Sequence, residues 1–392
     1  MTQRLITAIA ICCPRSGSGS GVLPDTTPNA DGLQRGARGF VLPLTLWIVA
    51  ILGLAIAAVN TWVQLAVENA IVLRDKTEDL RAAADLRNEL VYLLATRPKT
   101  VRGIEIGGDL TLPPRSDFNA IMMADYSSNR ALRVDGTSYW SETYPDIELR
   151  MQDGNGLVQL NTVNPAPIEG LLRTLDVEPS LRTRLVDTLR DFTDEDDFNR
   201  LSGAEARDYA LLNRPPPFNQ ALLTPYHARE AIGWDQVPQL WQKDLESPLV
   251  TTCASSGFNP NTAPETALIA VLPRMTLEGA KKIIAARTQK PLRNQRETAR
   301  ASGISMIEEP FFYSFFPGPC VIVDMINHTA GERTRISLSL VPFSKVQPWR
   351  YDYELRIPYR TDPEQDADSA TDIARETFPA PETLFAGIGR DN

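Results

Sequence analysis

The sequence predicts an α+β protein in which a long N-terminal helix packs on an antiparallel sheet, with a large helical domain inserted into that sheet. Three observations lead to this fold. An uncharged apolar segment, residues 40–59, continues into an amphipathic helical pattern. Segments with β-type alternation then occur in two blocks, one before residue 163 and one after residue 317. Between these blocks the chain is typical of short helices separated by Pro- and Asn-rich breaks.

The apolar segment indicates a membrane span. Residues 40–59 contain no charged side chain, and a helix needs ~20 such residues to cross the hydrocarbon core of a bilayer. Arg35 and Arg38 precede the segment, and basic residues on that side favour a cytoplasmic N-terminus. The rest of the chain is therefore expected across the membrane.

Three interpretations of this N-terminus stay open. The first is a secretory signal peptide, for which Ala55-Ile56-Ala57 offers a small-x-small cleavage pattern. The second is a plain single-span anchor. The third is a basic leader that ends at Gly39 and is cut before Phe40, the first residue of a long helix.

The remaining elements predict the domain organisation. Arg97-Pro98 ends the long helix, because a residue before proline disfavours helical backbone. Asp153-Gly154-Asn155-Gly156 indicates a hairpin turn. Asn161-Thr162 and Asn261-Thr262 each precede a helix pair, which suggests a weak repeat and helix-capping Asn-Thr pairs. We expect a leader at 1–39, a long helix at 40–98 (transmembrane at 40–59), the first sheet part at 99–163, the inserted helical domain at 164–316, the second sheet part at 317–358 and a disordered acidic tail at 359–392.

Composition and motifs argue against nucleic-acid binding and against catalysis. The formal charge of the 392 residues is −9, whereas phosphate binding requires clustered Lys and Arg. There are two histidines, His227 and His328, without metal-ligand spacing, and neither a Gly-x-Ser-x-Gly elbow nor a phosphate loop is present. We therefore expect a protein that is not an enzyme.

One acidic segment is a candidate cation site. Asp191, Asp194, Glu195, Asp196 and Asp197 follow a predicted helix, and Glu205 comes shortly after them. Hard cations such as Ca²⁺ take six to eight oxygen ligands, which such a turn supplies. The spacing does not match an EF-hand, and a solvated acidic turn explains the pattern equally well.

Two cysteines are left once the leader is set aside. Cys12 and Cys13 lie in the predicted leader, so Cys253 and Cys320 remain. An extracytoplasmic domain allows them to form one intramolecular disulfide. Two separate buried thiols are the alternative.

A second functional hypothesis comes from residues 258–287. This segment resembles the helix-hairpin-helix modules of DNA-uptake receptors, which implies a membrane-anchored periplasmic binding protein. However, Pro273-Arg274-Met275-Thr276 stands where DNA-binding versions carry hairpin glycines. Lys281, Lys282 and Arg287 add little positive charge in acidic surroundings, so we expect no DNA contact.

The motifs together resemble the minor pseudopilin K family of type II secretion systems (general secretion pathway protein K), over roughly residues 35–357. The resemblance departs from the family pattern at Phe192, where tryptophan is usual. It rests on the Arg38-Gly39 junction, Leu46-Trp47, Gly156 to Thr162, Asp191 to Asp196, Gly203 to Glu205 with Tyr209, Phe218 to Leu222 and Asn261 to Ala263.

The resemblance implies a pilin-like fold with an inserted helical domain, cleavage after Gly39 and N-methylation of Phe40. It also implies a single-pass protein of a Gram-negative inner membrane with its bulk in the periplasm. Other minor pseudopilins (I and J type), the inner-membrane secretion platform and secreted substrate or the outer-membrane secretin are the implied partners. The implied calcium ligands are Asp191, Asp194, Asp196, Asp197 and Glu205.

The resemblance further implies a role at the filament tip. Most pilins carry Glu five residues into the mature chain, where it neutralises the N-terminal amine of a neighbouring subunit inside the membrane. Here that residue is Leu44. An apolar residue suits a subunit with no neighbour above it, and a bulky insertion would obstruct further stacking.

Overall fold

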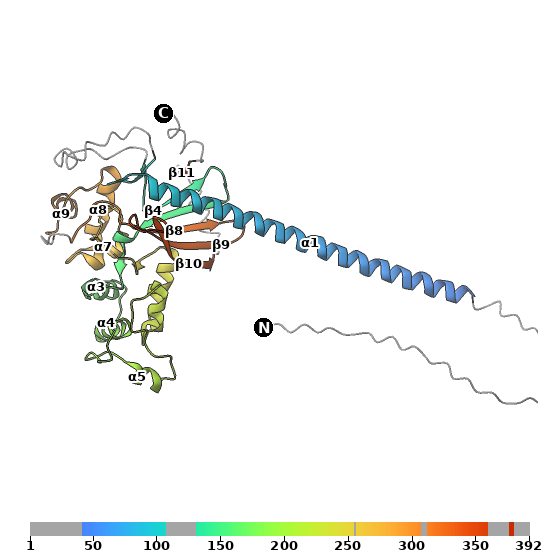
Figure 1. Ribbon diagram of the computed structural model, residues 1–392, viewed down its shortest axis with the longest axis horizontal. Coiled ribbons are helices and arrows are strands. Elements are labelled where there is room, and N and C mark those ends of the chain that lie inside the picture. Colours follow the sequence, from blue (N-terminus) through green and yellow to red (C-terminus); the bar gives the residue numbers. More distant parts are fainter. Residues whose placement is uncertain (1–40, 107–130, 255, 307–311, 360–375, 380–392) are drawn as a thin grey trace, which may run out of the picture. The chain divides into compact units, whose positions relative to one another are not determined.

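The computed structural model of this protein describes residues 41–106, 131–254, 256–306, 312–359 and 376–379. The predicted leader and the Gly39–Phe40 junction lie outside these residues. The chain divides into two compact units, one that ends at Ala70 and one that begins at Ile71. Helix α1 (Val41–Thr96) contributes to both units and is the long helix that the sequence predicts (Figure 1).

The first part of α1 has the properties of a membrane-spanning helix. An 18-residue window of it has a mean hydropathy of 2.5 and contains no buried residue. Large apolar side chains such as Trp47 and Leu54 are 69% and 76% exposed. The hydroxyl groups of Thr45 and Thr61 donate to the helix carbonyls of Leu42 and Ala57, so both are satisfied without water. By length and composition this helix can cross a membrane.

The larger unit is organised around a six-stranded sheet with the order β10-β9-β8-β5-β4-β11. The central pair, β5 and β8, is antiparallel, with Ile147 opposite Asn327. The inserted domain separates these two strands in sequence. The strands are β4 (Asp135–Ser141), β5 (Ile147–Asp153), β8 (Cys320–Asn327), β9 (Glu332–Leu340), β10 (Trp349–Pro358) and β11 (Glu376–Phe378). A smaller antiparallel sheet holds β1 (Lys99–Thr100), β2 (Gly103–Glu105) and β3 (Ala131–Leu132).

Strand β11 corrects one expectation. The segment 359–392 was predicted to be disordered, and this is wrong for Glu376–Phe378, which pairs in parallel with β4. The Phe378 side chain is 1% exposed, and its carbonyl accepts a hydrogen bond of 3.1 Å from the Glu142 N–H. A three-residue edge strand carries no periodicity that a sequence pattern can reveal.

The apolar face of the sheet forms a core with the second part of α1. Ala82, Leu86, Leu90, Leu93 and Leu94 of α1 recur at three- and four-residue steps and are buried. On the strands, every second side chain points toward these α1 residues, because successive residues of a strand point to opposite sides of the sheet. These strand residues include Leu149, Met151, Val321, Val323, Met325, Ile336 and Leu338.

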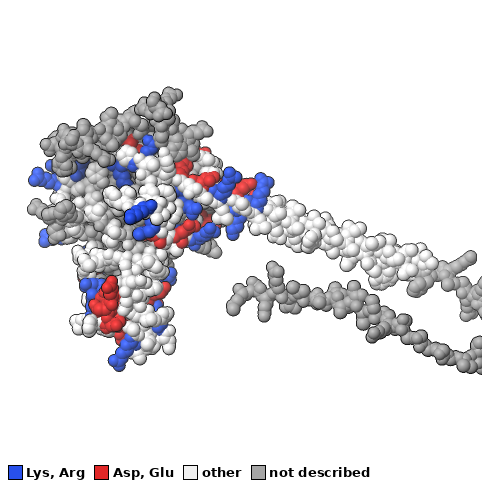
Figure 2. Space-filling model, viewed as in Figure 1, with Lys and Arg blue, Asp and Glu red and all other residues white. Residues whose placement is uncertain are grey.

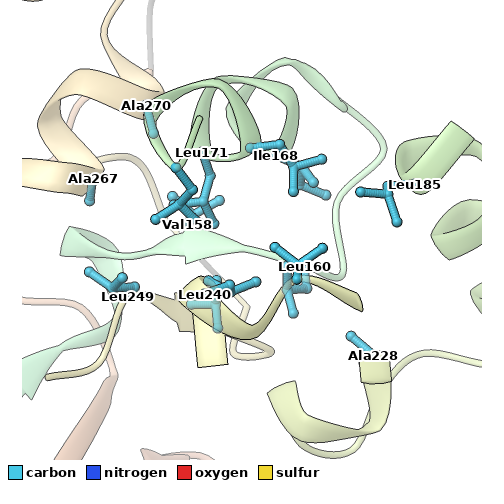
Figure 3. Packing of buried hydrophobic residues seen from close by; sticks show 14 of the residues in the cluster. Val158, Leu160, Ile168, Leu171, Leu185, Ala228, Leu240, Leu249, Ala267 and Ala270 are labelled. Atoms are coloured by element: carbon cyan, nitrogen blue, oxygen red, sulfur yellow. The ribbon is translucent and has the colours of Figure 1, made fainter. Parts of the chain in front are cut away.

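The inserted domain has its own hydrophobic core (Figure 3). Val158 and Leu160 belong to it, so this core begins before the predicted boundary at residue 164. A parallel two-stranded sheet joins β6 (Val158–Gln159) and β7 (Val250–Thr251). The helices are α3 (Ala166–Thr174), α4 (Pro179–Thr193), α5 (Ala206–Leu211), α6 (Pro238–Glu246), α7 (Glu265–Val271), α8 (Leu277–Gln289) and α9 (Gln295–Ser302), with single turns η1 (Gly154–Gly156), η2 (Pro225–Glu230) and η3 (Trp234–Gln236).

The predicted hairpin at Asp153–Gly156 is wrong. The chain forms the turn η1 there, and β6 pairs with β7 instead of returning along β5. The cause is Asp153, which is fully buried and accepts hydrogen bonds from Gly318 N at 2.8 Å and from Thr262 Oγ1 at 2.8 Å. These bonds direct the chain out of the sheet and into the helical domain.

The weak repeat is real, but its Asn residues do not cap helices. Asn161 exchanges two hydrogen bonds with the backbone of Leu222, both of 2.9 Å. Asn261 makes the same pair with Leu292, at 2.7 and 2.8 Å. In both copies of the repeat, the Asn side chain therefore binds the backbone of a residue far along the chain. A sequence pattern cannot reveal this role, because the two partners are brought together only by folding.

The inserted domain packs on the polar face of the large sheet through buried charges. Arg335 of β9 is 1% exposed and donates two hydrogen bonds to Asp324 of β8, at 2.7 and 2.8 Å. Its third nitrogen reaches Asp244 of α6 and the Tyr226 hydroxyl, at 3.2 and 3.0 Å. Burial lowers the pKa of Arg335, but the neighbouring carboxylates outweigh it and hold that pKa above its usual value.

Candidate cation site

Asp191, in the last turn of α4, is the most deeply buried carboxylate of the acidic segment. Its side chain is 0% exposed. It lies directly against Gly203, where an added Cβ would come within 1.8 Å of Asp191 Oδ2. A side chain at residue 203 would therefore displace the carboxylate, which explains a glycine at this close approach.

Arg200 crosses the turn and contacts two of these carboxylates. Its Nη1 atom lies 2.5 Å from Asp191 Oδ1 and 2.5 Å from Asp194 Oδ2. Its backbone N–H also donates to Asp191 Oδ2, at 3.1 Å. The opposite oxygen of Asp194, Oδ1, is buried and accepts no hydrogen bond from the described residues.

Glu205 is the residue of this cluster that most clearly lacks a partner. It is 4% exposed at the start of α5, and neither of its carboxylate oxygens accepts a hydrogen bond within the described part of the chain. Burial, together with repulsion from Asp191 and Asp194, raises the pKa of Glu205 to about 7. A buried carboxylate without a partner is costly, so this group favours a bound cation.

Asp196 and Asp197 are placed differently from the other three predicted ligands. Both are exposed. Asp196 Oδ1 accepts from the Phe198 N–H at 2.9 Å, and Asp197 Oδ1 accepts from Asn219 Nδ2 at 3.2 Å. The Oδ1 atom of Asn219 is buried and lacks a partner among the described residues. This side of the turn is therefore organised by its own hydrogen bonds.

Asp191 and Asp194 share Arg200, and Glu205 lies near enough for both charges to raise its pKa, whereas Asp196 and Asp197 lie at the exposed rim. Asp194 and Glu205 carry buried oxygens without a hydrogen-bond partner among the described residues, and carboxylate oxygens are the ligands that a hard cation such as Ca²⁺ takes. Acidic side chains gather over the region of α4 and α5 (Figure 2). Binding of a cation is what this arrangement can do chemically.

Two residues near the site were not predicted from the sequence. Asn219 is close to Asp197 only after folding, because more than twenty positions separate them. Arg200 is the single basic residue between Asp197 and Glu205. This position within an acidic segment was the one feature of the sequence that could have indicated an ion pair with the carboxylates. No periodicity links it to Asp191.

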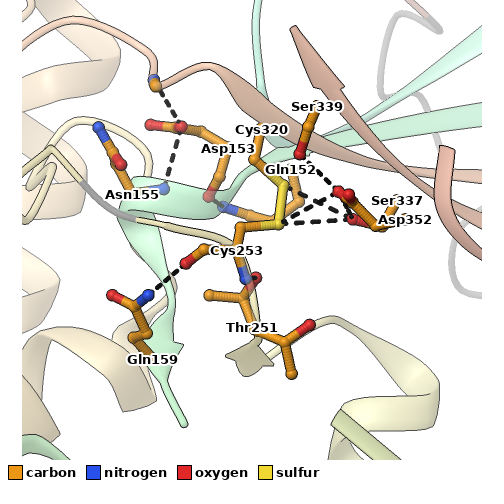
Figure 4. The surroundings of a disulfide bond; sticks show 12 residues. Gln152, Asp153, Asn155, Gln159, Thr251, Cys253, Cys320, Ser337, Ser339 and Asp352 are labelled. Atoms are coloured by element: carbon orange, nitrogen blue, oxygen red, sulfur yellow. Dashed lines mark hydrogen bonds between the residues drawn. A yellow bond between two sulfur atoms is a disulfide. The ribbon is translucent and has the colours of Figure 1, made fainter. Parts of the chain in front are cut away.

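Cys253 and Cys320 form a disulfide, which was one of the two alternatives (Figure 4). It joins the segment after β7 to the first residue of β8, and so connects the inserted domain to the large sheet. Asp352 lies beside it and accepts a hydrogen bond of 3.3 Å from the Ser337 hydroxyl. A cavity of about 520 Å³ opens next to the bridge.

The segment compared with helix-hairpin-helix modules does form such a unit, with α7, a hairpin and α8. Arg274 at the hairpin has a φ of 61°, in the left-handed region. Arg287 does not point to solvent: it is 9% exposed and donates to the carbonyls of Pro260 and Ala263, at 2.8 and 2.6 Å. This arginine therefore ties α8 to the segment before α7 and leaves Lys281 and Lys282 as the exposed cations of α8.

Comparison with known proteins finds a similarity in the middle of the chain. The family model for protein K of the type II secretion system matches residues 149–243. A search of curated proteins found no match. The chain is also similar to a chain in the crystal structure of the GspK–GspI–GspJ complex from the enterotoxigenic Escherichia coli type 2 secretion system, at 15% identity. That similarity covers 54% of this chain and 79% of the other, with a TM-score of 0.36, which is too low to support an argument.

The matched residues include most of β5, the helices α3 to α5 and the acidic segment. This part of the chain is therefore similar to protein K of the type II secretion system.

Proposed function

We propose that this protein is a minor pseudopilin of the type II secretion system that caps the tip of a periplasmic pseudopilus and primes its assembly. The observation that carries the proposal is the match of residues 149–243 to the protein K family model, in a chain whose helix α1 is long and apolar enough to cross a membrane. The large helical domain inserted between β5 and β8 supports the tip position, because such a bulky unit would hinder stacking of a further subunit.

Leu44 supports the same position. It lies in the apolar part of α1, where most pilins carry the Glu that neutralises a neighbour's terminal amine. A subunit at the tip has no such neighbour above it. We further propose minor pseudopilins of the I and J type as filament partners, and the inner-membrane platform and secreted substrate or the secretin as additional contacts.

N-terminal sequencing of the mature protein tests the proposal directly. We expect the chain to begin at Phe40 with a methylated amine, as prepilin processing requires. A start near Ala58 indicates a secreted soluble protein, and an intact leader indicates a plain anchor; either result overturns the proposal. As a second test, Leu44→Glu should leave secretion largely intact, whereas complete loss of assembly would contradict the tip position.

We also propose that Asp191, Asp194 and Glu205 bind Ca²⁺, with Asp196 and Asp197 at the rim of the site. The support is the set of buried, unpaired oxygens on Asp194 and Glu205. Chelation should lower the melting temperature of the full chain in detergent, and Glu205→Gln should greatly reduce the stabilisation by calcium. Glu195→Gln is the matched control, because it removes the same charge from an exposed position of the same turn. A melting temperature that does not respond to chelator would refute the site.

A further inference from the structure

Three arginines line one small cavity of the larger unit. The cavity has a volume of about 50 Å³, and Arg102, Arg133 and Arg287 form part of its wall. They come from three separate segments, namely the turn between β1 and β2, the link between β3 and β4, and α8. Asp135 is the one carboxylate among the described residues of this wall. Because arginine keeps its proton in proteins, three guanidinium groups and one carboxylate leave a net charge of +2.

Two of these arginines carry nitrogen atoms without a hydrogen-bond partner in the described part of the chain. Arg287 is 9% exposed, and its Nε atom is buried and unpaired within these residues. The Nε atom of Arg102 is buried and unpaired there as well. A buried donor on a charged group costs free energy when nothing accepts its proton. Both atoms therefore favour a ligand that accepts hydrogen bonds.

Asp135 does not compensate the whole cluster. One of its oxygens, Oδ2, pairs with Arg133 Nη2, and the other, Oδ1, accepts a hydrogen bond of 2.6 Å from Thr137 Oγ1. Burial lowers the pKa of Arg287 to about 10; Asp135 opposes this shift, and repulsion from Arg133 adds to it. Arg287 is therefore a buried cation that the carboxylate of this wall compensates only in part.

The uncharged polar side chains of the wall already have partners. The Asn261 side chain binds the backbone of Leu292, as described above. Thr262 Oγ1 donates to Asp153 at 2.8 Å, and Thr288 Oγ1 donates to a carbonyl of its own helix at 2.8 Å. Within the described wall, the side-chain donors that remain for a ligand are therefore guanidinium N–H groups.

We propose that this cavity binds one phosphate group between Arg102, Arg133 and Arg287. Guanidinium N–H groups match phosphate oxygens in pairs. A phosphate group carries a charge of about −1.5 to −2 at pH 7, which matches the excess charge of the wall, whereas a carboxylate supplies a single charge. One water needs ~10–15 Å³ of cavity, so a volume of about 50 Å³ has room for a small polyatomic anion. Bound there, the phosphate group joins the small sheet to the inserted domain.

The affinity test is calorimetric titration of inorganic phosphate into the full chain in detergent, with sodium chloride holding the ionic strength constant. Arg102→Gln should bind phosphate at least about tenfold more weakly, since a hydrogen bond to a charged group contributes this much or more. Arg190→Gln is the matched control: Arg190 is half-buried like Arg102 but lies on α4, outside the cavity wall, and its loss should change the affinity less than about twofold. Acetate should bind the unaltered chain at least about tenfold more weakly than phosphate.

Two sources supply this chemistry, free inorganic phosphate and a phosphate monoester such as a lipid headgroup. Titration of glycerol 3-phosphate distinguishes them. Equal affinity for glycerol 3-phosphate and inorganic phosphate shows that the site accepts an esterified group. Binding of inorganic phosphate alone shows that the cavity takes the free anion. Either result upholds the site.

A second measurement does not depend on the folding of a variant. A dicarbonyl reagent that modifies arginines should label Arg102 several-fold more slowly at saturating phosphate, because the ligand occupies its guanidinium group. The exposed Arg207 in the same sample is the internal reference and should be labelled at an unchanged rate. The proposal is overturned if phosphate binds no more tightly than acetate, if Arg102→Gln binds it as tightly as the unaltered chain, or if phosphate leaves the labelling of Arg102 unchanged.

Discussion

Replacing Arg335 with methionine should destabilise the protein by about 3 kcal/mol, because it removes the buried cation between the sheet and the inserted domain. Asp324 and Asp244 are both 2% exposed and would remain buried without it. Loss of one member of a buried ion pair costs about 3–5 kcal/mol.

The lower end of this range follows from the remaining contacts. Asp244 keeps three hydrogen bonds, from the Tyr226 hydroxyl and from the N–H groups of Leu249 and Val250. Within the described ranges, Asp324 keeps Arg333 as its one remaining side-chain partner, with Nη1 4.0 Å away. Most of the cost therefore comes from Asp324, and adding Asp324→Asn to Arg335→Met should recover part of it.

The assay is urea unfolding of the full chain in detergent, followed by tryptophan fluorescence. Trp234 and Trp241 are buried in the core of the inserted domain and report its unfolding. Arg74→Met is the control: Arg74 pairs with Glu78, but the two side chains are 76% and 63% exposed, so the loss should stay below about 1 kcal/mol. A loss below about 1 kcal/mol for Arg335→Met, or no recovery in the double variant, would refute the reasoning.

Two further predictions concern the two hydrophobic cores. Gly170→Ala should lower the free energy of unfolding by about 1–3 kcal/mol, since its Cβ would lie 2.0 Å from the Ala270 carbonyl oxygen and separate α3 from α7; an unchanged melting temperature would contradict this close approach. Burial raises the pKa of Glu89 from its usual 4.5 to about 7, so the folded state holds this proton more tightly than the unfolded state, and stability falls as the pH rises from about 4.5 through 7. The unfolding free energy of the unaltered chain and of Glu89→Gln is measured at pH 5 and at pH 8. The decrease between these pH values should be about 1–2 kcal/mol smaller in the variant. An equal decrease in both proteins would show that another group causes the pH dependence.

The elements with strong periodicity were predictable from the sequence. The apolar run of α1 and the three- and four-residue spacing from Ala82 to Leu94 predict a helix and the face that it buries. The return of β-type alternation after residue 317 predicts that β8 completes the first sheet. Strand β11 and the turn at Asp153 were not predictable, because hydrogen bonds to residues far along the chain determine them.

The candidate site was only partly predictable. The density of acidic residues identified the segment as a candidate, and the resemblance to the protein K family implied five ligands in it, namely Asp191, Asp194, Asp196, Asp197 and Glu205. Burial separates them: Asp191 is paired with Arg200, Asp194 and Glu205 keep buried oxygens without a partner among the described residues, and Asp196 and Asp197 form hydrogen bonds at the surface.

The sequence by itself determined that the chain has a helix able to span a membrane, a divided sheet, an inserted helical domain and an acidic turn, because each depends on composition or on local periodicity. Only the tertiary structure decided which charges are neutralised. Arg335 compensates Asp324 across two strands, Arg200 compensates Asp191, and Glu205 finds no hydrogen-bond partner for its carboxylate in the part of the chain that the structure describes. Pairing of buried charges depends on distances of a few ångströms between segments that folding brings together, and a linear sequence does not contain those distances.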